Sequence, residues 1–145
     1  MTRAYEHRHV VLFQETNLVG NVYFVSHLAW QGSCRERFLR DHVPDILAEL
    51  RDGLALVTVS CQCEYLAELA AFDEIAIRMT LVEAVQHRID LRFDYVRLRG
   101  DAEQLVAVGH QRVACMRRDG ERLIPTPIPA GLRAALAPYG ADGAG

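Results

Sequence analysis

Residues 88–95 read RIDLRFDY, and this stretch decides the class of fold. Its apolar side chains, Ile89, Leu91, Phe93 and Tyr95, alternate with charged ones. Successive side chains of a β-strand point to opposite faces, so the alternation predicts a strand with one buried face and one solvated face. Antiparallel sheets commonly show this pattern, because one face packs on the core while the other meets water.

Three further segments outside this stretch have strand character. Residues 57–65 and 75–81 alternate in the same way, whereas residues 105–116 form a longer run that is apolar on both faces. Apolar character on both faces favours a central strand that is covered on both sides. Turn signals at Arg99-Gly100-Asp101 and Asp119-Gly120 separate or follow these strands.

One long helix is predicted ahead of the four strands. From His27 to His42 the apolar residues recur at helical spacing, with Ser26 as the expected N-cap and Pro44 ending the helix. The face expected to pack on the sheet comprises Leu28, Gly32, Leu39 and Val43, with Phe38 beside it.

The remaining segments complete the predicted order. Residues 6–13 predict a first strand, residues 45–50 a short amphipathic turn, and residues 130–139 a short helix. One strand, one long helix and four strands define an α+β protein whose antiparallel sheet packs one face on a single helix. Residues 1–139 are expected to form one domain and residues 140–145 a disordered tail. One helix covers one face only, so we expect a second subunit to bury the other face or an edge.

Composition excludes several classes of function. The formal net charge is −3, which leaves no basic footprint for nucleic acid. No apolar run reaches the roughly 18 residues that a membrane span needs. The polar stretch from Met1 to His9 lacks the features of a signal peptide, so a cytoplasmic protein is expected.

Neither the cysteine spacing nor any known catalytic motif indicates a cofactor. Cys61-Gln62-Cys63 has no second ligand pair, so neither a metal site nor a disulfide is predicted. The chain contains no Gly-rich phosphate loop, no nucleophile elbow and no Ser/His/Asp spacing. No cofactor is therefore expected.

Arg35 is the first candidate for chemistry. It lies seven residues after Leu28 and four before Leu39, on the stripe expected to face the sheet. Gly32, one turn earlier, costs about 1 kcal/mol relative to alanine inside a helix, which makes sense if another group must approach that face closely. In the alternative interpretation, Arg35 pairs with an acid at the helix edge.

The loop of residues 15–21 is the second candidate. It precedes the helix N-terminus, where unpaired N–H groups and the helix dipole suit a developing oxyanion. An ordinary turn, in which Asn17 and Gly20 supply the turn conformations, explains the loop equally well. His27 lies beside this loop and stays a candidate, while the other histidines are scattered and are interpreted as structural.

These residues also carry a family resemblance. Residues 16–28, TNLVGNVYFVSHL, resemble the signature segment of hotdog thioesterases of the 4-hydroxybenzoyl-CoA type. The following helix, with Trp30, Arg35 and Glu36, resembles the aromatic-rich, Arg-Glu-bearing helix of that family. Residues 63–74 resemble a further family segment without its proline, and the likeness extends over residues 6–135.

Three departures from the general family pattern indicate which subfamily the chain resembles. Asn17 stands where the general family carries its catalytic Asp, Phe24 where His is common, and His27 where Tyr is usual. An amide has no basic lone pair, so Asn17 can be neither nucleophile nor general base. The Asn-for-Asp pattern is similar to that of thioesterases associated with enediyne polyketide synthases. Those enzymes cleave a long β-keto polyene thioester from an acyl carrier protein.

The resemblance implies a fold, an assembly and a reaction. The fold would be a hotdog, an antiparallel sheet wrapped around one long helix, and dimers would pair into a homotetramer. The reaction would be hydrolysis of a β-keto polyene thioester on the acyl carrier protein domain of an iterative polyketide synthase. The released acid would then lose CO₂. The alternatives are a general acyl-CoA thioesterase, for which no basic surface patch is obvious, and a catalytically silent acyl-binding hotdog module.

The resemblance also implies roles for individual residues. Arg35 would orient and stabilise the thioester or β-keto oxygen, and Asn17 would hydrogen-bond the carbonyl or position water. Glu36 would act as a base or anchor Arg35. The residues implied to form the substrate pocket are Tyr23, Phe24, His27 and Gly32.

Overall fold

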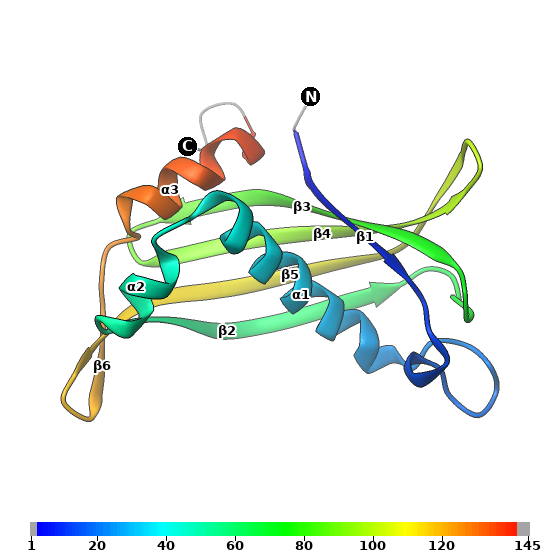
Figure 1. The fold of residues 1–145 in the computed structure, drawn as a ribbon, viewed down its shortest axis with the longest axis horizontal. Helices are drawn as coiled ribbons and strands as arrows, with labels where there is room; N and C mark the ends of the chain where they lie inside the picture. The colour runs from blue at the N-terminus through cyan, green and yellow to red at the C-terminus, as the bar shows by residue number, and fades with distance from the viewer. Residues whose placement is uncertain (1–2, 142–145) are drawn as a thin grey trace.

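A curled antiparallel sheet wraps around one long helix, α1 (Phe24–His42), in the computed structural model, which describes residues 3–141 (Figure 1). The strands are β1 (Tyr5–Val10), β2 (Leu54–Tyr65), β3 (Glu74–Val85), β4 (Arg88–Arg99), β5 (Ala102–Asp119) and β6 (Arg122–Pro125). They lie in the order β1-β3-β4-β5-β2, and β6 pairs with the end of β5. The short helices are η1 (Phe13–Glu15), α2 (Ile46–Arg51), α3 (Ala130–Leu136) and η2 (Ala137–Tyr139). The predicted α+β class is confirmed.

The alternating stretch that decided the class is strand β4. Its apolar residues are buried, and in the β3–β4 pair Met79 lies opposite Phe93 while Ile77 lies opposite Tyr95. The predicted strand at residues 105–116 is the middle of β5, which pairs with β4 on one side and with β2 on the other. The predicted central position of this strand is therefore confirmed.

Helix α1 begins three residues earlier than predicted. Its N-cap is Tyr23 rather than Ser26. The N–H of Val22 donates to the backbone carbonyl of Leu69 at 2.8 Å, and the N–H of Tyr23 donates to the backbone carbonyl of Glu15 at 2.9 Å. Those bonds hold the chain extended up to Tyr23, and the helix starts directly after it. The predicted end at His42, before Pro44, is confirmed.

The buried face of α1 differs from the predicted one. The buried residues are His27, Trp30, Gln31, Cys34 and Phe38. One residue turns a helix by about 100°, so this face is rotated from the predicted stripe by roughly one position. The prediction holds for Phe38 and Val43, which are buried. It was wrong for the rest of the stripe because it counted apolar residues, whereas Gln31 and His27 are polar and buried. Arg35 and Leu39 consequently lie on the half-buried flank beside β2.

The C-terminal segment closes the end of the core where α1 finishes. Residues 130–139 form α3 and η2, which confirms the predicted short helix, and Tyr139 packs edge-on against Tyr5 and Phe38. Gly140, the first residue of the expected tail, forms an isolated bridge with Leu81. Residues 142–145 of the expected tail lie outside the described residues.

Strands β1 and β2 form the two edges of the sheet within residues 3–141. Along β2 the outward side chains are exposed, and Val59 retains 57% of its accessible surface. No helix among the described residues combines the length and apolar character that a membrane crossing needs. The four cysteines, at positions 34, 61, 63 and 115, are free thiols, and within the described part of the chain no cluster of three potential ligands could hold a metal.

Candidate functional site

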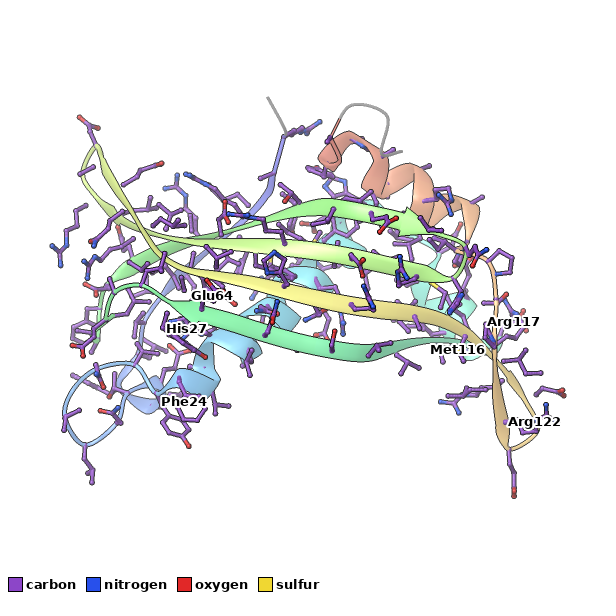
Figure 2. The ribbon with its side chains drawn as sticks, turned by 180° about the vertical axis from the view of Figure 1, so that it is seen from behind. Phe24, His27, Glu64, Met116, Arg117 and Arg122 are labelled. Atoms are coloured by element: carbon purple, nitrogen blue, oxygen red, sulfur yellow. The ribbon has the colours of Figure 1, made fainter. Side chains whose placement is uncertain are left out.

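A hollow of about 300 Å³ lies where α1 begins and β2 ends. Figure 2 labels Phe24 and His27 at this end of the molecule, with Met116, Arg117 and Arg122 at the opposite end. The lining residues are Asn21, Val22, Phe24, His27, Tyr65, Leu66, Ala67, Glu68 and Leu69. Three of the predicted pocket and loop positions therefore meet here: residue 21 of the loop, Phe24 and His27.

Two tyrosines on the sheet fix the first turns of α1 over this hollow. The hydroxyl of Tyr65 donates to the carbonyl of Phe24 at 2.8 Å, and that of Tyr95 donates to the carbonyl of His27 at 2.6 Å. The burial of Tyr95 raises the pKa of its phenol, so the hydroxyl stays protonated and keeps its role as donor. The sheet thus holds the helix N-terminus in one position.

His27 is the most unusual side chain of the hollow. It is 3% exposed and lies against the edge of Tyr65 at 4.8 Å and near Trp30 at 5.0 Å between ring centroids. Burial lowers the pKa of His27 to about 4, so the imidazole is neutral at pH 7. Neither ring nitrogen has a hydrogen bond of good geometry within residues 3–141, although the backbone of Phe24 lies close enough to oppose part of the lowering of the His27 pKa. The buried Oδ1 of Asn21 has no partner within the same residues.

Glu15 anchors the loop to the helix and to β1, a role that the sequence analysis missed. Its carboxylate accepts hydrogen bonds from Trp30 Nε1 at 2.6 Å, from His9 Nε2 at 2.8 Å and from the Leu12 N–H at 2.9 Å. Burial acts to raise the pKa of Glu15, but these three donors together hold it below its usual range. No periodic pattern marks such a residue, since its partners are distant in sequence.

Asn17 lies in an exposed turn, as the turn interpretation of the loop expected. Its Oδ1 accepts from the Val19 N–H at 3.0 Å, and its carbonyl accepts from the Gly20 N–H at 3.0 Å. Gly20 adopts φ 91°, a conformation that favours glycine. The Oδ1 of Asn17 is engaged in the turn, so the side-chain NH₂ is the group that can donate to a ligand. Tyr23, also exposed, packs against Phe24 at 4.8 Å.

Arg35 forms part of a polar network between α1 and the sheet. Its guanidinium donates to Gln111 Oε1 at 2.6 Å and to Thr58 Oγ1 at 3.1 Å. Gln111 in turn donates to Gln31 at 3.4 Å, and Gln31 donates to the Gln62 carbonyl at 3.0 Å. Burial lowers the pKa of Arg35, although guanidinium remains charged at neutral pH.

Arg35 makes no ion pair with any residue of the described range 3–141, which sets aside pairing with an acid at the helix edge. Glu36 is exposed and acts on Arg35 only through its charge, which favours the protonated guanidinium. Arg35 is therefore a cation held by neutral acceptors. Its charge remains available to a ligand.

A second hollow, of about 600 Å³, lies between α1, α2 and the start of β2. Arg35, Glu36 and Arg40 form its polar part; the apolar lining comprises Leu39, Val43, Pro44, Ile46, Leu47, Leu50 and Leu56. Gly32 lies one turn before Arg35, and a Cβ placed there meets no atom within 4 Å among the described residues. The close approach predicted at Gly32 is thus not made within one chain.

The candidate residues fall into two groups along α1. His27 and Arg35 are eight residues apart, a rise of about 12 Å at 1.5 Å per residue. Asn17, Tyr23, Phe24 and His27 belong to the start of the helix, whereas Gly32, Arg35 and Glu36 lie further along it. One chain does not bring Asn17 and Arg35 into contact, because their side chains bond to different neighbours.

The fold and these two hollows define a hotdog thioesterase. Residues 11–136 match the Thioesterase-like superfamily, and the chain belongs to it. The chain is also similar, with 56% identity and a TM-score of 0.91, to the dynemicin thioesterase, whose crystal structures revealed induced-fit and allosteric effects upon polyene binding. That similarity covers 95% of this chain and 98% of the other. The predicted hotdog fold, thioesterase activity and link to the enediyne group are confirmed.

More distant structures share the fold. A mutant of 4-hydroxybenzoyl CoA thioesterase complexed with 4-hydroxybenzoyl CoA superposes with a TM-score of 0.82 at 20% identity, covering 92% of this chain and 99% of the other. A thioesterase superfamily protein from Jannaschia sp. CCS1 has a TM-score of 0.75 and 25% identity, covering 91% and 80%. A comparison with curated protein sequences gave no significant match.

Proposed function

We propose that the protein hydrolyses a β-keto polyene thioester carried by the acyl carrier protein domain of an enediyne polyketide synthase. The released β-keto acid then loses CO₂ to give a linear polyene ketone. The observation that carries the proposal is Arg35, a cation held by neutral acceptors beside a hollow of about 600 Å³ with a mainly apolar lining. This arrangement suits a substrate that has a polar head and a long apolar chain.

The chemistry relies on stabilising negative charge on the carbonyl oxygen. Asn17 supplies an amide donor in place of a carboxylate, and Arg35 supplies a positive charge in a partly buried position, where electrostatic attraction is stronger than in water. One well-placed oxyanion donor contributes about 2.7–4 kcal/mol to the barrier reduction. The β-keto group adds to this by making the thioester carbonyl more electrophilic.

A two-fold dimer provides a way to join the two groups of residues. Strand β2 presents an unpaired edge with exposed Val59 and Cys61, and two copies of such an edge can pair antiparallel. Antiparallel pairing sets the first half of one α1 helix beside the second half of the other. Asn17 of one chain and Arg35 of another would then face one substrate. We propose that two such dimers form a homotetramer.

General acyl-CoA hydrolysis is the second candidate, and one observation favours it. The β5–β6 hairpin carries three exposed arginines, Arg117, Arg118 and Arg122, although no basic patch is obvious from the sequence. Figure 2 labels Arg117 and Arg122 at this end of the molecule. Arginine suits phosphate groups, such as those of coenzyme A. Asp119 and Glu121 lie in the same hairpin and offset part of this charge.

Turnover on matched substrates tests the proposal. The purified protein is assayed with a β-keto acyl chain on a carrier protein, with the same chain on coenzyme A, and with an unsubstituted acyl-CoA of equal length. We expect the carrier-bound β-keto substrate to give the highest kcat/KM, and mass spectrometry to detect the acid and the ketone. A preference for unsubstituted acyl-CoA would instead identify a general thioesterase. Tight binding without turnover of any substrate would identify a silent acyl-binding module.

A further inference from the structure

We infer that His27 and Asn21 bind the water that attacks the thioester, with His27 accepting its proton. This inference rests on the proposed hydrolysis and assigns it a general base. The family resemblance implies a place in the substrate pocket for His27, and for Glu36 a role as a base or as an anchor for Arg35.

The first support is that both side chains offer buried polar atoms to the same hollow. His27 is 3% exposed, and its ring nitrogens and Oδ1 of Asn21 are buried without a hydrogen bond of good geometry among residues 3–141. The nearby backbone of Phe24 can engage one ring nitrogen, which leaves the other as the acceptor. Both residues line the hollow of about 300 Å³ at the start of α1. A buried polar group left without a hydrogen bond is unfavourable and rare in folded proteins, so two such groups on one hollow indicate a polar ligand.

The number of donors and acceptors identifies that ligand. Neutral imidazole has one acceptor nitrogen, and Oδ1 of Asn21 is a second acceptor. One water molecule has two O–H donors, and it would satisfy both acceptors while its oxygen lone pair remains directed elsewhere. A thioester or keto oxygen has no hydrogen to donate and would leave both acceptors unpaired. The hollow therefore suits water on this side and the carbonyl of the substrate on another.

The helix N-terminus lies beside this position. Phe24, which lines the same hollow, is the first residue of α1, and its N–H is one of the first four that have no partner inside a helix. The helix dipole places partial positive charge there. A thioester carbonyl bound at this end would have its developing oxyanion near N–H donors and its carbon near the water held by His27.

Other candidate bases are exposed or already engaged. Glu68 also lines the hollow that contains His27, but it is exposed to solvent. Glu15 accepts hydrogen bonds from Trp30, His9 and the Leu12 N–H, so its oxygens are occupied. Glu36 is exposed and belongs to the second hollow, near Arg35. Within the described residues, His27 is the basic nitrogen that lines the hollow at the start of α1.

The reaction balances with these groups alone. The water oxygen forms a bond to the thioester carbon as its proton moves to the imidazole of His27. The tetrahedral intermediate then collapses, the C–S bond breaks, and the leaving sulfur takes the proton from the imidazolium. The products are the acid and the free thiol, and His27 is neutral again. The low pKa of His27 makes it a weak base but makes its imidazolium a strong acid toward the leaving thiolate.

The test combines truncation with chemical rescue. His27→Ala removes the imidazole, and we expect kcat on the β-keto thioester to fall by about 10²-fold, the lower end of the range for general acid–base catalysis, with KM changed less than threefold. Free imidazole should restore turnover in a saturable manner, because it can enter the space that the side chain leaves. His42→Ala, an exposed histidine on the same helix, is the matched control and should keep wild-type kcat with no response to imidazole.

His27→Phe keeps an aromatic ring and separates chemistry from packing. It should be folded, lose the same activity and show no rescue. Wild-type kcat in folded His27→Phe would overturn the assignment, and so would loss of activity in His27→Ala that imidazole does not restore. Neither outcome is confused with failure of the proposed function, which would appear as absence of turnover of the β-keto substrate by the wild-type protein.

Discussion

Gly109 lies in β5 beneath the polar network of α1, and its replacement by alanine should be strongly destabilising. A Cβ built at Gly109 overlaps Nε2 of Gln31 and lies 3.0 Å from its Cδ and 3.2 Å from the Gln62 carbonyl oxygen. Gln31 is fully buried and cannot move into solvent. It can make room only by giving up its 3.0 Å hydrogen bond to that carbonyl.

Two costs follow from this overlap. Overpacking a core typically costs about 1–3 kcal/mol, and leaving a buried donor or acceptor unpaired costs about another 1–3 kcal/mol. Alanine recovers about 0.5–1 kcal/mol of backbone entropy relative to glycine. The net loss in the free energy of unfolding should be about 1–5.5 kcal/mol. Turnover should fall as well, because Gln31 orients Gln111, which binds Arg35.

Urea unfolding followed by circular dichroism measures this loss, with wild type and variant at one protomer concentration because association shifts apparent stability. Gly131→Ala is the matched control. Gly131 is exposed at the start of α3, a Cβ there meets no atom within 4 Å among the described residues, and the change should be neutral or stabilise by up to about 1 kcal/mol. A loss below 0.5 kcal/mol in Gly109→Ala, about the noise of a neutral surface change, would refute the packing described for Gln31.

Four further predictions concern the site and the assembly. Arg35→Ala should remove most hydrolysis in a folded protein, and Arg35→Lys should also be poor because a point charge does not replace a planar fork; steady-state rates and circular dichroism decide this. Asn17→Ala should lower kcat by roughly 10²–10³-fold, and Asn17→Asp should give no gain on acyl-CoA; a gain there would favour a drifted acyl-CoA enzyme. His27 has a pKa of about 4 when folded and 6.5 as its ordinary value, so the unfolded chain binds the proton first as pH falls. Its contribution to stability, about 3 kcal/mol, should be present above pH 6.5 and lost between pH 6.5 and 4 in wild type, and unfolding curves of His27→Phe should lack that loss. Light scattering should give four times the chain mass of 16.3 kDa, and a value near a single chain would contradict the proposed homotetramer.

The strands could be predicted from the sequence because each shows its two faces locally. Alternation at residues 88–95 and apolar character at residues 105–116 are properties of neighbouring residues, and the structure confirms a strand at each and the central position of the second. The predicted cover on both faces of that strand is not complete within one chain, because His110 and Arg112 are exposed. The short helix after the last strands also followed from local composition. Elements of this kind depend on short-range patterns that a sequence displays directly.

The helix face and the site were less accessible to the same reasoning. Gln31 and His27 are polar, so a count of apolar residues assigned them to the surface. In the structure, Gln31 is hydrogen-bonded to Gln62 of β2 and Gln111 of β5. The backbone carbonyl of His27 accepts a hydrogen bond from Tyr95 of β4. The roles implied for Asn17, Arg35 and Glu36 came from the family resemblance and stay predictions. These partners of Gln31 and His27 lie 31 to 80 residues away in the sequence, and spacing along one helix does not reveal them.

The bond between Trp30 and Glu15 gives the protein a built-in optical probe. Trp30 is the single tryptophan of the chain, its Nε1 is fixed at 2.6 Å from a carboxylate, and its ring lies 5.0 Å from that of His27 at the hollow. All intrinsic indole fluorescence therefore reports on one place. A conjugated chain bound beside it would quench this fluorescence by accepting the excitation energy of the indole, so occupancy could be titrated without a label or turnover.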